Sequence, residues 1–562
     1  MIDRNGKKNG LIVSRREMIG ALTAAAAVSP AAIAPAAIAP AANAPAFIRD
    51  LFAAGAPVVE TTAGKVRGSF ADGAYTFLCV PYGADTSGAG RFMPPRPPGP
   101  WAGVREIPAK RAIAPQTDPA PAPGPKIPAL VGMMSIGSEE GSVETEDCLN
   151  LTIYTPGLDN ARRPVMFWCH GGGYAQGSGS ARMYHGAALA RAGDVVVVSV
   201  THRLNVLGFA HLAGSGPDFA SSGNAGMLDI VLALEWVKKN IRRFGGDPGK
   251  VLVFGQSGGG GKVAALLSMP SARGLFQRAA MQSGSTRRFQ DPDDAAEAPR
   301  GLFAELGLRP DQGRELQKVP LERLMAAHFA ASKRPGGAGR YAPVRDGAVI
   351  PRHPFHPTAN PLAAPVPLVI GTVRTEGTAF QLADEAAYQL DGAGLEARMK
   401  STLGDQDGAA AVALYRKLMP GASPSDLYFE MTSDRGRRAA IEIAELKTAQ
   451  GVTPAYLYEL TWSTPVYDGL LRTPHSLDLP LVFNLADHPV WAPYTGGVPE
   501  SIQVARAMMG AWVAFARTGA PGTRTLPWPA FTLENFETMV FDVRSEARKD
   551  PFRETRKFWE GV

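Results

Sequence analysis

Apolar residues are concentrated in short runs that alternate with longer amphipathic segments. Between residues 227 and 244, Val231, Leu234 and Val237 fall on one side of a helix, with lysines and arginines on the other. Four other segments are almost continuously apolar, as expected of parallel strands that are buried on both faces: residues 164–169, 194–200, 251–254 and 367–371. The pattern therefore predicts strands joined by helices.

This alternation determines the expected fold class. Strands that alternate with helices pack as a mostly parallel sheet with helices on both faces, an α/β fold. Shorter strands are expected at residues 58–68 and 76–81, before a proline-rich irregular loop at residues 91–100. No internal repeat or low-complexity linker follows residue 50. Residues 47–562 are therefore predicted to form a single domain with large insertions.

Residues 1–46 have a different composition. Basic residues precede an apolar run at residues 18–28, and an alanine- and proline-rich tract continues to Ala46. With Arg15 and Arg16 at the head of the apolar run, this order resembles a twin-arginine signal peptide. The alternatives are a retained membrane anchor or a disordered leader, but a membrane-spanning helix needs about 20 apolar residues. We therefore expect export to the periplasm or beyond, with no stable membrane span after processing.

Net charge excludes one class of partner. The 562 residues include 58 basic and 52 acidic side chains, for a formal net charge of +6. Residues 1–44 hold five basic and two acidic side chains, and so account for three of those six charges. The remainder has no dense basic block interleaved with aromatic residues, so no nucleic-acid partner is expected.

Cysteine and histidine patterns argue against a disulfide framework and a metal site. Cys79, Cys148 and Cys169 are too few for such a framework, and their odd number leaves at least one thiol free. Cys169 ends an apolar run and is expected in the core. No His-x-x-x-His or Cys-x-x-Cys pair is present, so neither a metal nor another cofactor is predicted.

The strongest chemical signal follows the apolar run at residues 251–254. Residues 255–259, Gly-Gln-Ser-Gly-Gly, form a Gly-x-Ser-x-Gly sequence between that strand and a helical segment. Small residues on both sides allow the sharp turn that exposes the hydroxyl of a nucleophilic serine, here Ser257. The alternatives are an idle serine in a glycine-rich turn or a phosphate-binding loop. The phosphate-loop pattern fails because Val263 follows Lys262.

A second glycine cluster follows the run at residues 164–169. Residues 170–173 are His-Gly-Gly-Gly, and glycines at this place allow backbone N–H groups to approach a substrate oxygen. The N–H groups of Gly172, Gly173 and Gly258 are the candidate oxyanion hole. The cluster alone is also typical of an ordinary turn, but together with the serine motif it points to acyl transfer.

With these motifs the chain resembles the type-B carboxylesterase family, over roughly residues 57–531. The resemblance implies an α/β-hydrolase fold and a catalytic triad in the order Ser, Glu, His. It assigns the acid to Glu376 and the base to His475, with Asp478 as the alternative acid and a solvated surface position as the alternative for either residue. Further matching segments are residues 146–151, 223–229, 233–237, 244–248, 281–285 and 512–519.

The resemblance predicts a serine carboxylesterase that acts through an acyl-enzyme. His475 would remove the Ser257 proton, Ser257 would attack the ester carbonyl, and Glu376 would orient His475. Water activated by the same histidine would release the acid. A small-molecule ester and water are therefore the expected partners.

The chain departs from the family at three places. Residues 114–116 are Ala-Pro-Gln where many members have Cys-Pro-Gln, so the family's disulfide with Cys148 is not expected. The residue before the nucleophile, often Glu in eukaryotic members, is Gln256. Residues 128–144 contain no Trp of the kind that binds choline by a cation–π contact. Cholinesterase activity is therefore not expected.

Three residues are candidates for substrate binding. Arg287, Arg288 and Phe289 follow a segment that leads toward the acyl pocket in the family. Guanidinium groups there would suit an acidic acyl group, and the alternative is a solvated loop. An amidase or peptidase with the same triad and a non-catalytic binding protein of the same fold are the alternative functions. The joint presence of the three triad residues disfavours the binding protein.

Overall fold

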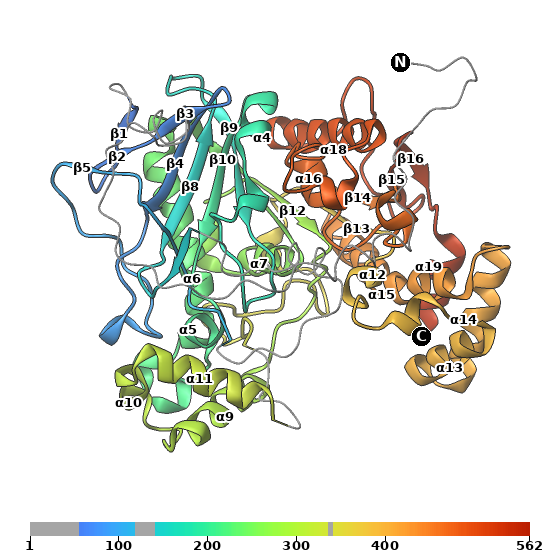
Figure 1. Ribbon diagram of the computed structural model, residues 1–562, viewed down its shortest axis with the longest axis horizontal. Helices are drawn as coiled ribbons and strands as arrows, with labels where there is room; N and C mark the ends of the chain where they lie inside the picture. Colours follow the sequence, from blue (N-terminus) through green and yellow to red (C-terminus); the bar gives the residue numbers. More distant parts are fainter. Residues whose placement is uncertain (1–55, 119–140, 335–340) are drawn as a thin grey trace, which may run out of the picture. The chain divides into compact units, whose positions relative to one another are not determined.

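An eleven-stranded sheet forms the centre of the fold (Figure 1). The computed structural model describes residues 56–118, 141–334 and 341–562, and these belong to one compact unit. The predicted export leader, residues 1–46, lies outside the described residues. Within the described ranges, no helix has both the length and the apolar character that crossing a membrane requires.

The inner strands of the sheet are parallel, and antiparallel strands lie at its edges. The seven parallel strands, in their order across the sheet, are β15 (Glu537–Phe541), β14 (Ala455–Leu460), β13 (Leu368–Val373), β12 (Arg278–Gln282), β11 (Gly246–Gln256), β9 (Arg163–Cys169) and β10 (Val196–Thr201). Beyond β15 lies β16 (Glu546–Lys549), and beyond β10 lie β8 (Asn150–Thr155), β4 (Ala74–Pro81) and β3 (Ser69–Ala71). The predicted α/β fold with a mostly parallel sheet is confirmed, and the four predicted core strands are β9, β10, β11 and β13.

Short strands outside this sheet form two further sheets. One contains β1 (Val58–Glu60), β2 (Lys65–Arg67) and β5 (Val104–Arg105), and the other β6 (Arg111–Ile113) and β7 (Ser142–Glu144). Residues 58–68 were predicted as a strand and instead form the β1–β2 hairpin. The chain reverses there because the Thr61 N–H donates to the Gly64 carbonyl at 2.9 Å.

Side chains of β9 alternate between two hydrophobic cores, because successive residues of a strand point to opposite faces. Phe167 packs in the core that includes α6 (Ala225–Asn240) and α15 (Pro424–Thr448). Trp168 packs in the core that includes α4 (Ala187–Gly193) and α18 (Pro499–Thr518). Helices therefore cover both faces of the sheet.

The remaining helices belong to the insertions and the C-terminal part of the chain. Helices α9, α10 and α11 form a yellow-green group in Figure 1 and share a small hydrophobic core with α5, the segment after it and Phe92. The bounds are α5 (Asn205–Phe209), α7 (Gly258–Leu266), α8 (Pro292–Ala295), α9 (Glu297–Leu306), α10 (Gly313–Lys318), α11 (Leu321–Ser332), α12 (Gly377–Phe380), α13 (Gly392–Leu403), α14 (Asp405–Leu418), α16 (Asp478–Val482), α17 (Ala492–Thr495) and α19 (Arg553–Gly561).

The strand order places one pair of strand ends at the point where a ligand is expected. Strand β9 lies between β10 and β11, so the chain moves to opposite sides of β9 when it enters β10 and β11. Ligands of open α/β sheets bind outside the carboxyl ends of the strands at such a switch point. Cys169 pairs with Gly255 at this edge, so the glycine cluster after β9 and the serine motif after β11 are neighbours.

A buried ion pair connects the segment after β10 to α6. The Arg203 guanidinium donates to both carboxylate oxygens of Asp229, at 2.6 and 2.9 Å, and both side chains are almost fully buried. Removing one member of such a pair leaves the other charge unpaired in the core. The pair therefore fixes the position of α6 against the end of β10.

We expect Asp229→Asn to lower the free energy of unfolding by about 3–5 kcal/mol, because Arg203 would remain buried without a counter-charge. Equilibrium unfolding in urea measures this change. The matched control is Asp218→Asn, which removes the exposed pair with Arg314 and should cost less than about 1 kcal/mol. Equal losses in the two variants would contradict the expectation.

Candidate active site

Ser257 occupies a sharp turn between β11 and α7. Its φ of 58° and ψ of −124° are a strained conformation for a residue with a side chain. The Ser257 N–H donates to the Gln282 carbonyl at 2.8 Å, which ties the turn to the end of β12. Ser257 thus has the strand–turn–helix setting of an exposed nucleophile.

Two glycines make this turn possible. A Cβ atom on Gly259 would lie 2.1 Å from the Cys169 carbonyl oxygen, and one on Gly255 would lie 2.5 Å from the Gly259 carbonyl carbon. Both clashes are with backbone atoms, which cannot rotate away. Only glycine fits at either position.

His475 and Glu376 come from loops that follow neighbouring strands, β14 and β13. His475 Nδ1 is hydrogen-bonded to Glu376 Oε2, and since a carboxylate only accepts, Nδ1 carries the hydrogen. Glu376 Oε1 accepts the Val373 N–H at 3.1 Å. Hydrogen bonds to both carboxylate oxygens therefore hold the Glu376 carboxyl group in one orientation.

Asp478, the alternative acid, has other partners. Its Oδ2 accepts hydrogen bonds from Gln282 Nε2 at 2.9 Å and from the Tyr458 hydroxyl at 3.0 Å. Burial raises the pKa of the Asp478 carboxyl to about 6. Glu376, and not Asp478, is the carboxylate bonded to His475.

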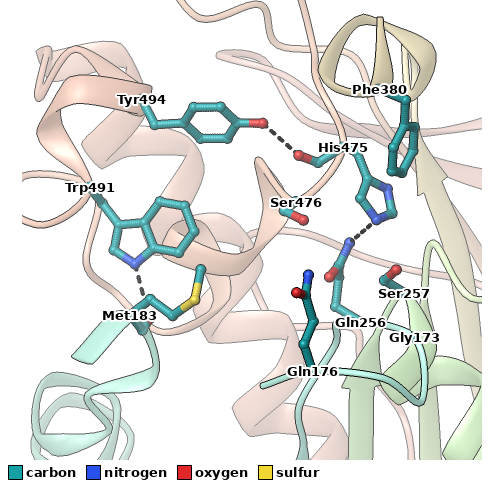
Figure 2. Close-up of a pocket in the computed structure, with 11 residues that line it drawn as sticks. Gly173, Gln176, Met183, Gln256, Ser257, Phe380, His475, Ser476, Trp491 and Tyr494 are labelled. Carbon is teal, nitrogen blue, oxygen red and sulfur yellow. Dashed lines mark hydrogen bonds between the residues drawn. The ribbon is translucent and has the colours of Figure 1, made fainter. Parts of the chain in front are cut away.

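The second ring nitrogen of His475 faces Gln256 and Ser257 (Figure 2). Gln256 Nε2 lies 3.0 Å from His475 Nε2, so the amide donates to the lone pair of an imidazole that carries its hydrogen on Nδ1. In the described part of the chain, Gln256 Oε1 has no hydrogen-bond partner. The amide nitrogen is therefore the group of Gln256 that contacts the imidazole.

The three candidate oxyanion-hole residues lie together beside Ser257. Gly172 and Gly173 have φ of 81° and 64°, in the left-handed region that favours glycine. A Cβ atom on Gly258 would lie 2.2 Å from the Gly173 carbonyl oxygen. Gly258 is the first residue of α7, so its N–H has no acceptor within the helix and is free to donate to a ligand.

Ser257, His475, Gly172 and Gly173 line one cavity of about 190 Å³. Its walls are mostly apolar, and Figure 2 shows the Trp491, Tyr494 and Met183 side chains on the side away from Phe380. Among the described residues that line the cavity, none has a lysine, arginine, aspartate or glutamate side chain. The other lining residues are Gln176, Met183, Gln256, Phe380, Ser476, Trp491 and Tyr494.

Comparison with known proteins agrees with this geometry. The family model described as the carboxylesterase family matches residues 55–559. The chain belongs to the carboxylesterase family. It is thus a serine carboxylesterase and hydrolyses carboxylic esters, as the resemblance in the sequence predicts.

Individual relatives match the esterase over most of its length. The para-nitrobenzyl esterase of Bacillus subtilis is 33% identical over 89% of this chain and 98% of that protein. The phenmedipham hydrolase of Pseudarthrobacter oxydans is 32% identical over 88% and 97%, respectively. A solved carboxylesterase of Geobacillus stearothermophilus matches with a TM-score of 0.74 at 36% identity, and the match covers 89% of this chain and 99% of that one. The predicted α/β-hydrolase fold is confirmed.

Aromatic side chains of the esterase support His475 from two sides. The Tyr494 hydroxyl donates to the His475 carbonyl oxygen at 2.5 Å. The Phe380 ring lies beside the imidazole, with 4.7 Å between ring centroids, and Phe380 is 64% exposed. The sequence analysis missed these cavity walls, because Met183, Phe380, Trp491 and Tyr494 come from separate segments without a shared motif.

The predicted substrate-binding residues Arg287, Arg288 and Phe289 do not line this cavity. Arg287 pairs with Glu442 on α15, Arg288 lies 3.6 Å from Asp291, and Phe289 is buried in a hydrophobic core. The structure therefore gives no support to the hypothesis that they bind an acidic acyl group.

The cysteines of the esterase all have free thiols. Cys148 and Cys169 are buried, and burial raises the pKa of both thiols. In the three described ranges there is no cluster of three or more His, Cys, Asp or Glu residues with the geometry of a metal site.

The glycine loop after β9 is held in place by Gln116 and Lys262. The Gly177 N–H donates to Gln116 Oε1 at 2.6 Å, and Lys262 Nζ donates to the His170 carbonyl oxygen at 2.8 Å. Lys262 is fully buried, and burial lowers the pKa of its amino group to about 7. The sequence analysis considered Lys262 only as part of a phosphate loop, because its partner is 92 positions away.

Because Lys262 is buried, we expect the free energy of unfolding to depend on pH in a specific way. Its folded-state pKa of about 7 lies below the usual value near 10.4, so the unfolded chain binds the proton more tightly. The stability of the wild type relative to Lys262→Met should therefore rise between pH 7 and about 10.4, by up to about 1.4 kcal/mol per pH unit, and be flat below pH 7. Urea unfolding of both proteins across this range tests the expectation, and a pH-independent difference would contradict it.

Because Gln256 contacts His475, we expect a substitution at Gln256 to change the pH profile of kcat/KM. In Gln256→Glu a carboxylate would face His475 Nε2 and stabilise the protonated imidazole. The acidic limb of kcat/KM should move to higher pH by about one unit. Gln176→Glu is the matched control, because Gln176 lines the same cavity and makes no hydrogen bond to His475 among the described contacts. An unmoved acidic limb in Gln256→Glu would show that the amide does not contact the working imidazole.

Proposed function

We propose that the esterase hydrolyses its substrate through an acyl-enzyme formed on Ser257, with His475 as the general base and Glu376 as the carboxylate that orients it. One observation carries the proposal. His475 Nδ1 is bonded to Glu376, so its Nε2 carries the lone pair, which lies beside the cavity that Ser257 lines and accepts a hydrogen bond from Gln256 in the absence of substrate. An imidazole in this tautomer can accept the serine proton.

The first half-reaction forms the acyl-enzyme. His475 Nε2 takes the proton of Ser257 Oγ while Oγ bonds to the ester carbonyl carbon, and the carbonyl electron pair moves onto its oxygen. The N–H groups of Gly172, Gly173 and Gly258 donate to that oxyanion. The oxyanion then collapses, the bond to the alcohol oxygen breaks, and the alcohol leaves with the proton from His475.

The second half-reaction releases the acid. A water molecule gives a proton to His475 Nε2 and bonds to the acyl carbon, which forms a second oxyanion in the same place. When this oxyanion collapses, Ser257 Oγ leaves and recovers the proton. Glu376 stabilises the imidazolium in both halves.

The cavity favours neutral esters of small to medium size. Its volume is about 190 Å³, comparable to an engineered cavity of about 150 Å³ that binds benzene. Its walls of Met183, Trp491 and Tyr494 suit apolar substituents. Relatives of similar identity are named for different substrates, a para-nitrobenzyl esterase, a phenmedipham hydrolase and a fumonisin B1 esterase, so the relatives do not identify one substrate for this chain.

Export by residues 1–46 stays a prediction.

A panel of p-nitrophenyl esters of increasing acyl length tests the proposal. Ser257→Ala and Glu376→Gln should each lower kcat by about a thousandfold or more, whereas Asp478→Asn should retain activity within about tenfold. A rapid burst of p-nitrophenol, equal to the enzyme concentration, would show the acyl-enzyme.

Two outcomes would contradict the proposal. Activity that survives Ser257→Ala would exclude Ser257 as the nucleophile. Preferential cleavage of the p-nitroanilide over the p-nitrophenyl ester of the same acyl group would favour an amidase.

A further inference from the structure

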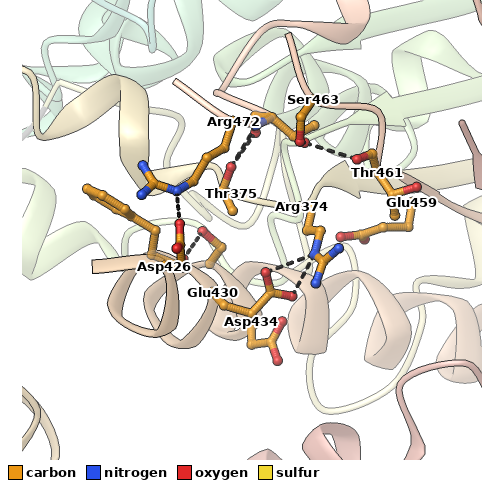
Figure 3. Close-up of polar contacts among 12 residues, drawn as sticks. Arg374, Thr375, Asp426, Glu430, Asp434, Glu459, Thr461, Ser463 and Arg472 are labelled. Atoms are coloured by element: carbon orange, nitrogen blue, oxygen red, sulfur yellow. Dashed lines mark hydrogen bonds and ion pairs between the residues drawn. The ribbon is translucent and has the colours of Figure 1, made fainter. Parts of the chain in front are cut away.

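Helix α15 contacts both loops that carry the proposed acid and base (Figure 3). Asp426 and Glu430 lie four residues apart on this helix, and so one turn apart on the same side. Glu430 binds Arg374 on the loop of the acid, and Asp426 binds Arg472 on the loop of the base. One helix thereby contacts two loops that are about 100 residues apart in the sequence.

The loop of the acid is attached to α15 on both sides of Glu376. Arg374, two residues before Glu376, donates from Nε to the two carboxylate oxygens of Glu430, at 3.1 and 2.9 Å. The Gly377 N–H, directly after Glu376, donates to Ser433 Oγ at 3.3 Å. The backbone of Glu376 therefore lies between two attachments to the same helix.

The loop of the base is attached through Arg472, three residues before His475. Arg472 Nε donates to Asp426 Oδ1, and its guanidinium lies over the Phe429 ring at 5.0 Å. Arg472 has a φ of 58°, and Tyr467, Asp468 and Ser476 in the same loop also have positive φ. Such conformations persist only where surrounding contacts impose them, and the Asp426–Arg472 pair is one of these contacts.

A direct connection joins the two loops. The Thr375 N–H and Oγ1 donate to the Thr473 carbonyl at 3.1 and 3.0 Å. The Thr473 N–H donates in turn to Thr375 Oγ1 at 2.9 Å. Both threonines are buried. Thr375 directly precedes Glu376, and Thr473 lies two residues before His475, so these three hydrogen bonds fix the separation of the two loops.

We propose that Asp426, Glu430 and the Thr375–Thr473 pair are positioning residues that set the hydrogen bond between Glu376 and His475. The inference rests on the proposed triad and names the contacts that determine its geometry. Catalytic hydrogen bonds need groups held within about half an ångström of the productive arrangement. A misplacement of about 1 Å can lower the rate about a hundredfold.

Contacts other than those with the two loops hold α15 on the sheet, so substitutions at the loop contacts can test the inference. Arg437, deeper on the same helix, is buried and donates from Nε to Glu459 on β14 at 3.0 Å. Arg437 also pairs with Asp434 and Glu430. Substitutions at Asp426 or Thr375 leave these contacts in place, so α15 should keep its position on the sheet.

Two variants test the inference. Asp426→Asn removes the charge that holds Arg472 and keeps an acceptor for the Ser423 hydroxyl, which donates to Asp426 at 2.6 Å. Thr375→Val removes the hydroxyl that bridges the loops. Each should lower kcat about tenfold or more with KM within about twofold, and should move the acidic limb of the pH profile to lower pH, because the protonated imidazole loses its oriented carboxylate.

Two further variants serve as controls. Thr375→Ser keeps the hydroxyl and should retain kcat within about twofold of the wild type. Glu445→Gln removes the negative charge that pairs with Arg438 at 2.9 Å on the same helix, away from both loops, and should leave kcat and the pH profile unchanged. Thermal unfolding of each variant shows whether it is folded; if Asp426→Asn is not, the comparison of Thr375→Val with Thr375→Ser decides alone.

The outcomes separate this inference from the proposed function. If Ser257→Ala keeps the activity of the wild type, the proposed function fails. If Ser257→Ala is inactive but Thr375→Val keeps its kcat and pH profile, only the inference is overturned. An equal loss in Glu445→Gln would also overturn it, because the effect would then belong to α15 in general.

Discussion

The close approach of two backbone segments is the constraint on which the active site depends. The backbone after β11 lies so near to the backbone after β9 that no Cβ atom fits at Gly258 or Gly259. Because both partners are main chain, no change of rotamer relieves the contact. The same approach brings the Ser257 turn against the Gly172–Gly173 segment, so main-chain contacts place the nucleophile beside the candidate oxyanion donors, and Gln116 and Lys262 hold the glycine loop there.

The acid and the base are placed in a different way. Neither Glu376 nor His475 belongs to a strand, and the loops that carry them depend on side-chain contacts with α15, with each other and with Tyr494. The site thus has a rigid half, built from backbone in the parallel sheet, and a half held by ion pairs and hydroxyl groups. Substitutions at positions remote in sequence from Glu376 and His475 are therefore expected to disturb mainly the half that side-chain contacts hold.

Local patterns in the sequence were enough to predict the half of the site that is built from backbone. The apolar runs of β9 and β11 and the glycines that follow them are each contained in about ten consecutive residues, and both strands and the turn are found where they are predicted. Glu376 and His475 have no such local pattern, and only the family resemblance pointed to them. Strand β14 was not predicted, because Glu459 interrupts its apolar character; the partner that allows its burial, Arg437, lies on a helix 22 residues away. The ion pair of Arg287, a candidate substrate-binding residue, could not be predicted for the same reason, since its partner Glu442 is 155 residues away in sequence.

The composition of the cavity wall has a consequence for turnover. Each reaction converts a neutral ester into an ionised acid inside a space whose described lining has no lysine or arginine side chain and is mostly apolar. A carboxylate loses hydration there without gaining a cationic partner, whereas the apolar groups of the ester lose nothing. An ionised acid should therefore bind in this cavity more weakly than a neutral ester, and Phe380, which lines the cavity, is exposed to solvent. We thus expect the same walls that suit an apolar ester to limit product inhibition.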